Sequence, residues 1–179
     1  MHVLLDPEEK ELIRSRLVQR TIKKNQVLLS AGKLCRNIYF VTKGCLRIYN
    51  TDKNGTEHNL LFYPENWWAA DLASFSGQSP AYYAISALED TKVLYLKHGV
   101  LEQLYIDVPK LKRFFRILIQ NGFSFYQGRI NSNLSKSAQE RYGLFQKQYP
   151  KLEQRIAQKQ IASYLGITPV FLSMIRKRK

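Results

Sequence analysis

The stretch from Gln158 to Lys177, QKQIASYLGITPVFLSMIRK, constrains the fold of this chain more than any other part of it. Two helices that cross at a steep angle need a small residue at their contact, a turn residue that tolerates positive φ, and apolar side chains directed into a shared core. Ala162 and Gly166 meet the first two needs. Five apolar residues meet the third: Ile161, Leu165, Ile167, Leu172 and Ile175. Because Thr168 and Pro169 supply an N-cap and a first helical residue, the stretch predicts a helix-turn-helix.

Positive charge is concentrated around this motif. The chain carries 28 Lys or Arg against 14 Asp or Glu, and residues 136–179 hold ten Lys or Arg against two Glu. Such charge favours a polyanion because each neutralised phosphate releases condensed counterions. We therefore expect double-stranded DNA as a partner, with Thr168 to Arg178 as the recognition helix in the major groove. A merely solvated basic face is the alternative.

The outward positions of this helix define the expected DNA contacts. Six residues would face base edges: Thr168, Pro169, Val170, Ser173, Met174 and Lys177. The apolar members can contact thymine methyl groups but cannot hydrogen-bond through their side chains. We therefore expect few hydrogen bonds from this helix to base edges. Four further residues are expected to bind phosphates, which sets position rather than sequence: Lys159, Gln160, Arg176 and Arg178. For Arg176 and Arg178, a frayed basic tail is an equal alternative.

From about Thr21 to Leu96 the chain shows short β-rich runs separated by turns. The expected strands are residues 26–29, 38–42, 45–49, 59–63, 82–87 and 92–95. Asn54-Gly55 predicts a hairpin with a type I′ turn, which needs positive φ at both residues. Strands at this spacing indicate a sandwich or barrel, so residues 1–108 are expected to form a β domain after a short helix that begins at Asp6 and Pro7.

A long helix is expected after Pro109. Its apolar stripe recurs four and three residues apart, as in a coiled-coil seam, at Leu111, Phe115, Leu118, Gly122 and Phe125. Gly122 and Gly128 each cost about 1 kcal/mol relative to Ala in a helix, so close packing is expected beside them. We expect residues 109–134 to dimerise the chain. Packing of the stripe on the chain's own barrel is the alternative.

The polar residues Asn131, Ser132, Asn133 and Ser135 predict a hinge before a DNA-binding domain at 135–179. Ser137 and Glu140 have the spacing of a capping box and mark a new helix. That helix should end by Gln148 or Tyr149, because Pro150 disfavours helical geometry in the residue before it.

The sequence disfavours several other functions. His2, His58 and His98 are scattered, and Cys35 and Cys45 lack zinc-ligand spacing, so the cysteines are expected in the core. Gly-rich phosphate loops and hydrolase motifs are absent from the sequence. We expect no enzyme, no metal and no cofactor, with a haem sensor through His58 or His98 as an alternative. With no apolar run of membrane length and no secretory signal, a soluble cytoplasmic protein without a membrane partner is expected.

Five segments together resemble the Crp/Fnr superfamily of bacterial transcription regulators, and most of all its short Bacteroidetes-type members. They are IYFVTKGCLRIYN, PENWWAADLASFSG, ISALEDTKVLYL, SAQERY and QKQIASYLGITPVFLSMIRKR, and the resemblance covers about residues 5–179. It implies an α+β fold with an N-terminal double-stranded β-helix (jelly roll) of the cyclic-nucleotide-binding type, a dimerisation helix and an all-α helix-turn-helix domain. It also implies a homodimer on a near-palindromic operator, RNA polymerase as a further partner and an unknown small-molecule effector.

The chain departs from the family where relatives bind cyclic AMP. Their Gly-Glu pair and their phosphate-binding Arg fall here at Ala70, Asp71 and Ala81, with Tyr82 next, and these four residues form the expected effector pocket. Burying a phosphate without a cation is costly, so we expect no tight cyclic AMP binding. Aromatic residues could line a pocket for another ligand or simply fill the roll; they are Trp67, Trp68, Tyr82 and Tyr83.

The recognition helix departs from the family as well. Positions that often hold Arg, Glu and Arg in relatives hold Pro169, Val170 and Met174 here. The operator of a relative therefore cannot be transferred to this chain. The same departure keeps open a second function, in which the chain is an effector- or partner-binding module whose helix-turn-helix binds DNA only non-specifically.

Overall fold

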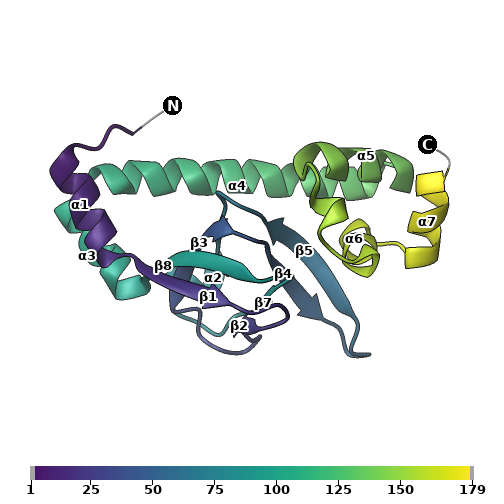
Figure 1. The fold of residues 1–179 in the computed structure, drawn as a ribbon, viewed down its shortest axis with the longest axis horizontal. Helices are drawn as coiled ribbons and strands as arrows, with labels where there is room; N and C mark the ends of the chain where they lie inside the picture. The colour runs from purple at the N-terminus through teal and green to yellow at the C-terminus, as the bar shows by residue number, and fades with distance from the viewer. Residues whose placement is uncertain (1–2, 178–179) are drawn as a thin grey trace.

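Two four-stranded antiparallel sheets form the N-terminal half of the computed structural model, which describes residues 3–177 (Figure 1). One sheet has the strand order β1-β8-β3-β6 and the other β2-β7-β4-β5. The strands are β1 (Val18–Ile22), β2 (Val27–Leu29), β3 (Asn37–Lys43), β4 (Leu46–Thr51), β5 (Glu57–Tyr63), β6 (Trp68–Ala69), β7 (Ala84–Ala87) and β8 (Thr91–Lys97). Because all neighbours in the two sheets except β4 and β5 are non-consecutive in sequence, the chain crosses repeatedly between the sheets, which confirms the jelly roll.

All six expected strands are present, and two further strands were not expected. β6 has only two residues, and four of the five residues of β1 are exposed, so neither carries the alternating apolar pattern that predicts a strand. Gly44 lies between β3 and β4 with φ +93°, and a Cβ there would lie 2.6–2.8 Å from atoms of Thr91 and Asp90. The close approach of these two turns therefore requires glycine.

The β4–β5 hairpin has a different turn from the one expected. Asn54 does not have positive φ, whereas Gly55 does, at 79°. The Asp52 carboxylate accepts hydrogen bonds from the Asn54 and Thr56 N–H groups at 2.8 and 3.0 Å. The type I′ prediction is wrong because this carboxylate organises a turn that needs a single left-handed residue.

Helices frame the roll and form the C-terminal part. They are α1 (Pro7–Arg16), α2 (Leu72–Gly77), α3 (His98–Asp107), α4 (Lys110–Ser135), α5 (Ala138–Gln148), the short 3₁₀ helix η1 (Leu152–Gln154), α6 (Gln158–Leu165) and α7 (Pro169–Lys177). The capping box of Ser137 and Glu140 is confirmed at the start of α5, and α5 ends at Gln148 as Pro150 predicted. In residues 3–177, no helix is long and apolar enough to cross a membrane.

The hinge expected at residues 131–135 is not found there, because these residues are the last turn of α4. The Ser135 hydroxyl donates to the Asn131 carbonyl at 2.8 Å, so the polar side chains continue the helix. The helix ends only at Lys136, which is extended with φ −116° and ψ 145°.

The apolar stripe of α4 packs on the chain's own roll, as the alternative reading had it. Leu111 and Phe115 are buried, and Leu118 and Phe125 pack against the same core. A Cβ at Gly122 would meet no heavy atom within 4 Å, so the close packing expected beside it does not occur within the chain. The exposed apolar residues of α4 lie on another face: Ile119, Phe123, Ile130 and Leu134.

The roll and the C-terminal helices share one apolar core. Phe62 of β5 lies 5.2 Å from the Tyr164 ring of α6 in a stacked arrangement, and 6.2 Å from the Phe145 ring of α5. Tyr149, after α5, contacts both Phe62 and Trp67 of the roll at 5.7 Å. These aromatic contacts attach the helix-turn-helix firmly to the β4–β5 side of the roll, where Figure 1 shows α6 beside β5.

Candidate DNA-binding face and effector pocket

The helix-turn-helix forms as the sequence predicts. Gly166 is left-handed with φ 67° and ends α6, and Ala162 is buried at the helix contact. The Thr168 hydroxyl accepts a hydrogen bond from the Phe171 N–H at 3.2 Å, which is the expected N-cap of α7. Of the expected core residues, Ile167 is only partly buried. The other four are at most 5% exposed: Ile161, Leu165, Leu172 and Ile175.

One face of α7 is open to solvent. Val170 is 70% exposed and Met174 47%, and Thr168, Pro169 and Lys177 are exposed beside them. Ser173 is half-buried, so it lies at the margin of this face rather than at its centre. Phe171 is 42% exposed and was not among the residues expected on this face. Its position next to the core residue Leu172 indicates a place at the boundary between the open face and the core.

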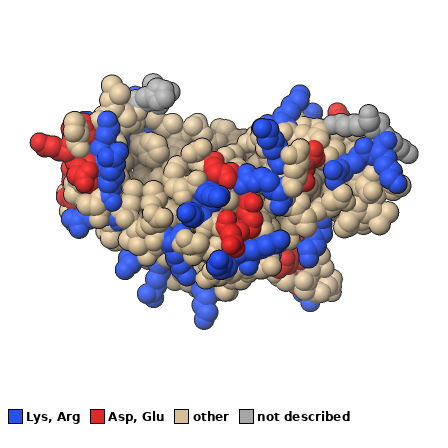
Figure 2. Space-filling view, in the orientation of Figure 1, with Lys and Arg blue, Asp and Glu red and all other residues tan. Residues whose placement is uncertain are grey.

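Cations border the same face. Lys159 and Arg176 are exposed as expected for phosphate contacts, and Arg178 lies outside the described residues. In Figure 2, Lys and Arg side chains lie at the end that carries α7 as well as over the roll and beside α1, whereas many of the acidic side chains gather over α1 and in a central group. On this face the cations at the α7 end therefore have few acidic side chains near them, which favours an anionic partner there.

Gln160 is the exception among the expected phosphate contacts. Its side-chain oxygen accepts hydrogen bonds from Arg47 at 2.9 Å and from Asn59 at 2.7 Å, both in the roll. Ser163, one turn later, accepts from the Asn59 N–H at 2.9 Å and donates to the Glu57 carbonyl at 2.7 Å. In this arrangement Gln160 anchors α6 to the roll and is not available to a DNA phosphate.

Arg47 is the buried centre of that anchorage. Its guanidinium pairs with Glu57 at 2.7 Å, donates to Ser86 at 3.0 Å and lies 3.9 Å over the Tyr49 ring. A buried cation is tolerated only when its hydrogen-bond donors are satisfied. The burial of Arg47 therefore depends on its acceptors, and one of these acceptors is the Gln160 side chain of α6.

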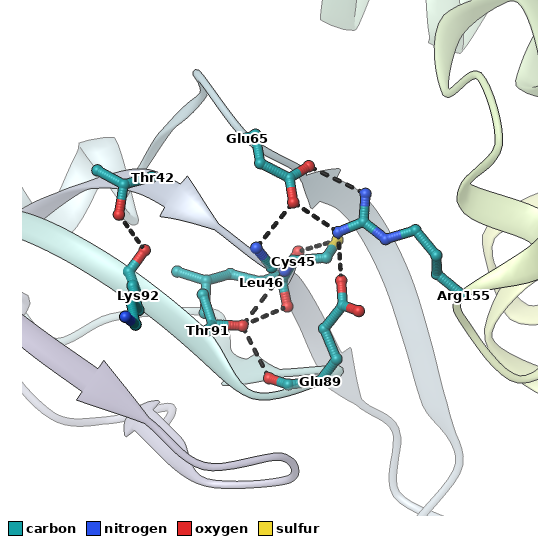
Figure 3. Close-up of polar contacts among 9 residues, drawn as sticks. Thr42, Cys45, Leu46, Glu65, Glu89, Thr91, Lys92 and Arg155 are labelled. Carbon is teal, nitrogen blue, oxygen red and sulfur yellow. Dashed lines mark hydrogen bonds and ion pairs between the residues drawn. The ribbon is translucent and has the colours of Figure 1, made fainter.

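A second ion-pair cluster ties the segment before α6 to the roll (Figure 3). Arg155 makes a two-pronged contact with Glu65, at 2.7 and 3.0 Å, and a further ion pair with Glu89. The same Glu65 accepts from the Gly44 N–H at 2.8 Å. The Arg155 guanidinium lowers the pKa of Glu65 to about 2.

Arg129 of α4 connects three parts of the molecule. Its guanidinium lies 3.5 Å over the Tyr164 ring, and one nitrogen donates to the Tyr164 carbonyl at 2.6 Å and the Asn59 carbonyl at 3.3 Å. One side chain thus joins the long helix, the roll and the last turn of α6. The sequence offered no signal for this role, because the partners are backbone carbonyls distant in sequence.

The expected effector pocket is closed around Asp71. This carboxylate is 3% exposed and accepts three backbone N–H groups, those of Ser74, Tyr82 and Tyr83, each at 3.1 Å. Ala70 and Ala81 are buried, whereas Tyr82 is 70% exposed. The four expected residues are therefore neighbours, but the Tyr82 N–H group already donates to the Asp71 carboxylate and is not free to bind a ligand.

An apolar cavity of about 410 Å³ lies between the roll and α4. Trp67, Trp68 and Ala70 line it together with Phe115 and Phe125 of the long helix, whereas Asp71, Ala81, Tyr82 and Tyr83 do not. Trp68 also packs against Phe40, Phe114 and Phe115, with ring centroids 5.2–6.5 Å apart. The two tryptophans therefore fill the roll and line its cavity at once.

Among residues 3–177, no group of three or more His, Cys, Asp or Glu lies close enough to hold a metal ion. His58 contacts Asp52 at 2.9 Å on the hairpin, and His98 packs edge-on against Phe75. Cys35 and Cys45 are buried, and burial raises the pKa of each thiol. These thiols are thus core residues with little thiolate character.

Comparison with known proteins agrees with this architecture. Residues 19–107 match the cyclic nucleotide-binding domain family, so the chain joins a roll of that class to a helix-turn-helix. The fumarate and nitrate reduction regulatory protein of Vibrio cholerae is 27% identical over 175 residues, which cover 89% of this chain and 68% of that protein.

Solved structures extend the likeness over the helical part. FixK2 from Bradyrhizobium japonicum has a TM-score of 0.81 at 16% identity, covering 90% of this chain and 83% of that one. A Crp/Fnr-family transcriptional regulator from Eubacterium rectale has a TM-score of 0.74 at 22% identity, covering 97% and 83%. In sequence and in fold, this chain is therefore similar to the Crp/Fnr superfamily of transcription regulators.

Proposed function

We propose that this protein is a sequence-specific transcription regulator that binds DNA as a homodimer, with α7 in the major groove. The observation that carries the proposal is the open face of α7, which includes Val170, Met174 and Lys177 and is bordered by Lys159 and Arg176. A helix presented in this way, beside cations that neutralise phosphates, is how helix-turn-helix proteins reach base edges. The names of the relatives, which are regulatory proteins, favour the same function.

The exposed apolar face of α4 supports the homodimer. Ile119, Phe123, Ile130 and Leu134 are spaced four, seven and four residues apart, so they form one stripe along the helix. An apolar stripe on a long helix is stable in water when a second helix covers it. A second copy of α4 would do so and would place two α7 helices on a near-palindromic site.

The proposed regulator is not gated by cyclic AMP. The Asp71 carboxylate is buried and already accepts three backbone N–H groups, and Ala81 stands where relatives have the Arg that binds the cyclic phosphate. A buried phosphate with no cation to offset its desolvation is unfavourable, so we expect no tight binding of cyclic AMP. Calorimetry should detect no binding of cyclic AMP at micromolar concentrations, and micromolar affinity would overturn this part of the proposal.

Selection from random duplexes tests the main proposal. We expect an enriched inverted repeat, and we expect Lys177→Ala and Met174→Ala to weaken binding to it, with Lys10→Ala on distant α1 as the control for lost charge. Anisotropy titrations at several salt concentrations give the number of phosphate contacts from the slope. Equal, salt-sensitive binding to every duplex would instead favour the second function, a partner-binding module with non-specific DNA attachment, which the exposed apolar Val170 and Phe171 make worth testing.

A further inference from the structure

A separate cavity of about 360 Å³ lies between α4, α5 and α6, away from the roll's interior. Its walls are largely apolar and include Phe125, Leu144, Phe145 and Leu165. A cavity of this size, with an apolar body and a few polar groups, has the character of a small-molecule site.

The polar groups of this cavity are mainly cationic. Arg129, Arg141 and Lys147 line it, and no Asp or Glu is among the lining residues. Within residues 3–177, neither arginine has a carboxylate oxygen within 4.0 Å, and their acceptors are backbone carbonyls: Asn59 and Tyr164 for Arg129, Lys136 and Leu165 for Arg141. The Nε atom of Arg141 is buried without an acceptor. Carbonyl oxygens satisfy donors but leave the two charges uncompensated.

Gly128 forms part of the cavity wall and leaves room beside the arginines. It lies in the interior of α4 and lines the cavity, and a Cβ there would meet no heavy atom within 4 Å. Glycine in a helix costs about 1 kcal/mol relative to Ala, and no close contact within the chain offsets this cost. A side chain at this position would instead project into the space beside the arginines.

We propose that this cavity binds a small organic carboxylic acid, whose apolar body packs between α4 and α5 and whose carboxylate lies against Arg129, Arg141 and Lys147. The anion compensates the two half-buried guanidinium groups, which lack an acidic partner among residues 3–177. Because the ligand would contact the long helix, α5 and the last turn of α6, which ends at Gly166 just before α7, it would bias the position of α7. That regulatory effect rests on the proposed function, whereas binding itself does not.

Calorimetry with 1-naphthoate as the probe, and 1-naphthamide as its uncharged match, tests binding on the full chain without DNA at one fixed ionic strength. We expect naphthoate to bind at least tenfold more tightly than naphthamide. Gly128→Leu fills the cavity without removing a cation and should weaken naphthoate at least tenfold, while Gly122→Leu, on the same helix but beside the other cavity, should leave it unchanged. Lys147→Gln should weaken naphthoate severalfold.

Three results would overturn the proposal. They are the absence of naphthoate binding, equal binding of naphthamide, and an affinity of Gly128→Leu for naphthoate equal to that of the parent. The third result would indicate that naphthoate is only attracted to the basic surface, because such attraction does not depend on the cavity. Circular dichroism and light scattering establish that each variant keeps its fold and oligomeric state. DNA is absent from this assay, so failure of the helix-turn-helix to recognise an operator leaves its outcome unaffected.

Discussion

Among single residues, Glu65 has the pKa with the clearest consequence for stability. Arg155 lowers this pKa from 4.5 to about 2 in the folded chain. Because the folded value lies below the unfolded one, the pair adds stability that is fully present above about pH 4.5 and is lost as the pH falls toward 2. The pair is about one-third exposed, so solvent screening reduces the expected contribution to about 1–2 kcal/mol.

Urea unfolding at several pH values checks this contribution. Between near-neutral pH and pH 3, the free energy of unfolding of the parent should fall more steeply than that of Glu65→Gln. Glu8→Gln, an exposed carboxyl of α1, is the matched control and should keep the parent's slope. If Glu65→Gln also kept that slope, the Arg155 contact would not stabilise the fold.

Thr168 makes a second prediction at this scale. Its hydroxyl satisfies the Phe171 N–H at the start of α7, so Thr168→Ala should lower the free energy of unfolding by about 1 kcal/mol. Thr168→Ser keeps the hydroxyl and should lose much less. Equal unfolding midpoints for all three proteins would mean that α7 does not depend on this cap.

Among the elements, α4 carries the sharpest prediction. Phe123 is 62% exposed at the middle of the apolar stripe, and Phe123→Glu would place a carboxylate in the proposed dimer seam. Light scattering should find a dimer for the parent and a monomer for Phe123→Glu. Ser124→Glu adds the same charge to a neighbouring exposed position off the stripe and should remain dimeric, and a dimeric Phe123→Glu would exclude this seam.

Local features of the helices could be predicted from the sequence, whereas the surfaces against which the helices pack could not. Caps and turns are local, so the sequence predicted the Ser137 box, the Gly166 turn and the Thr168 cap. The spacing of apolar residues in α4 predicted an apolar face, but such spacing does not identify the surface that covers this face. In the structure, the stripe that includes Leu111 and Phe115 packs against the roll. The helical state of residues 131–135 was missed because polar composition alone does not end a helix.

At the candidate site the same division holds. The exposure of Val170, Met174 and Lys177 follows from helical geometry once the core face is known. The anchoring of Gln160 by Arg47 joins residues more than a hundred positions apart, and the enclosure of Asp71 by the Tyr82 and Tyr83 amides depends on how two loops meet. Such pairings have no signal in a single sequence.

For the whole molecule, the shared aromatic core predicts cooperative unfolding. Phe62 contacts Phe145, Tyr149 and Tyr164, so the roll and the C-terminal helices each lose packing if the other unfolds. Tryptophan fluorescence, which reports on Trp67 and Trp68 of the roll, and far-UV circular dichroism, which reports mainly on the helices, should give coincident transitions at one protein concentration. Phe62→Ala should destabilise both signals together by about 3–5 kcal/mol. Two separate transitions would show that the two parts fold independently.

The attachment of α6 through Arg47, Asn59, Gln160 and Ser163 bears on how such regulators can be recombined. Moving residues 135–179 onto the roll of a relative would transplant only half of a complementary surface, with Gln160 and Ser163 left facing foreign strands. A functional chimera would need the matching hairpin as well. The segment that can be exchanged between relatives is therefore the helix-turn-helix together with the β4–β5 hairpin of the roll that it contacts.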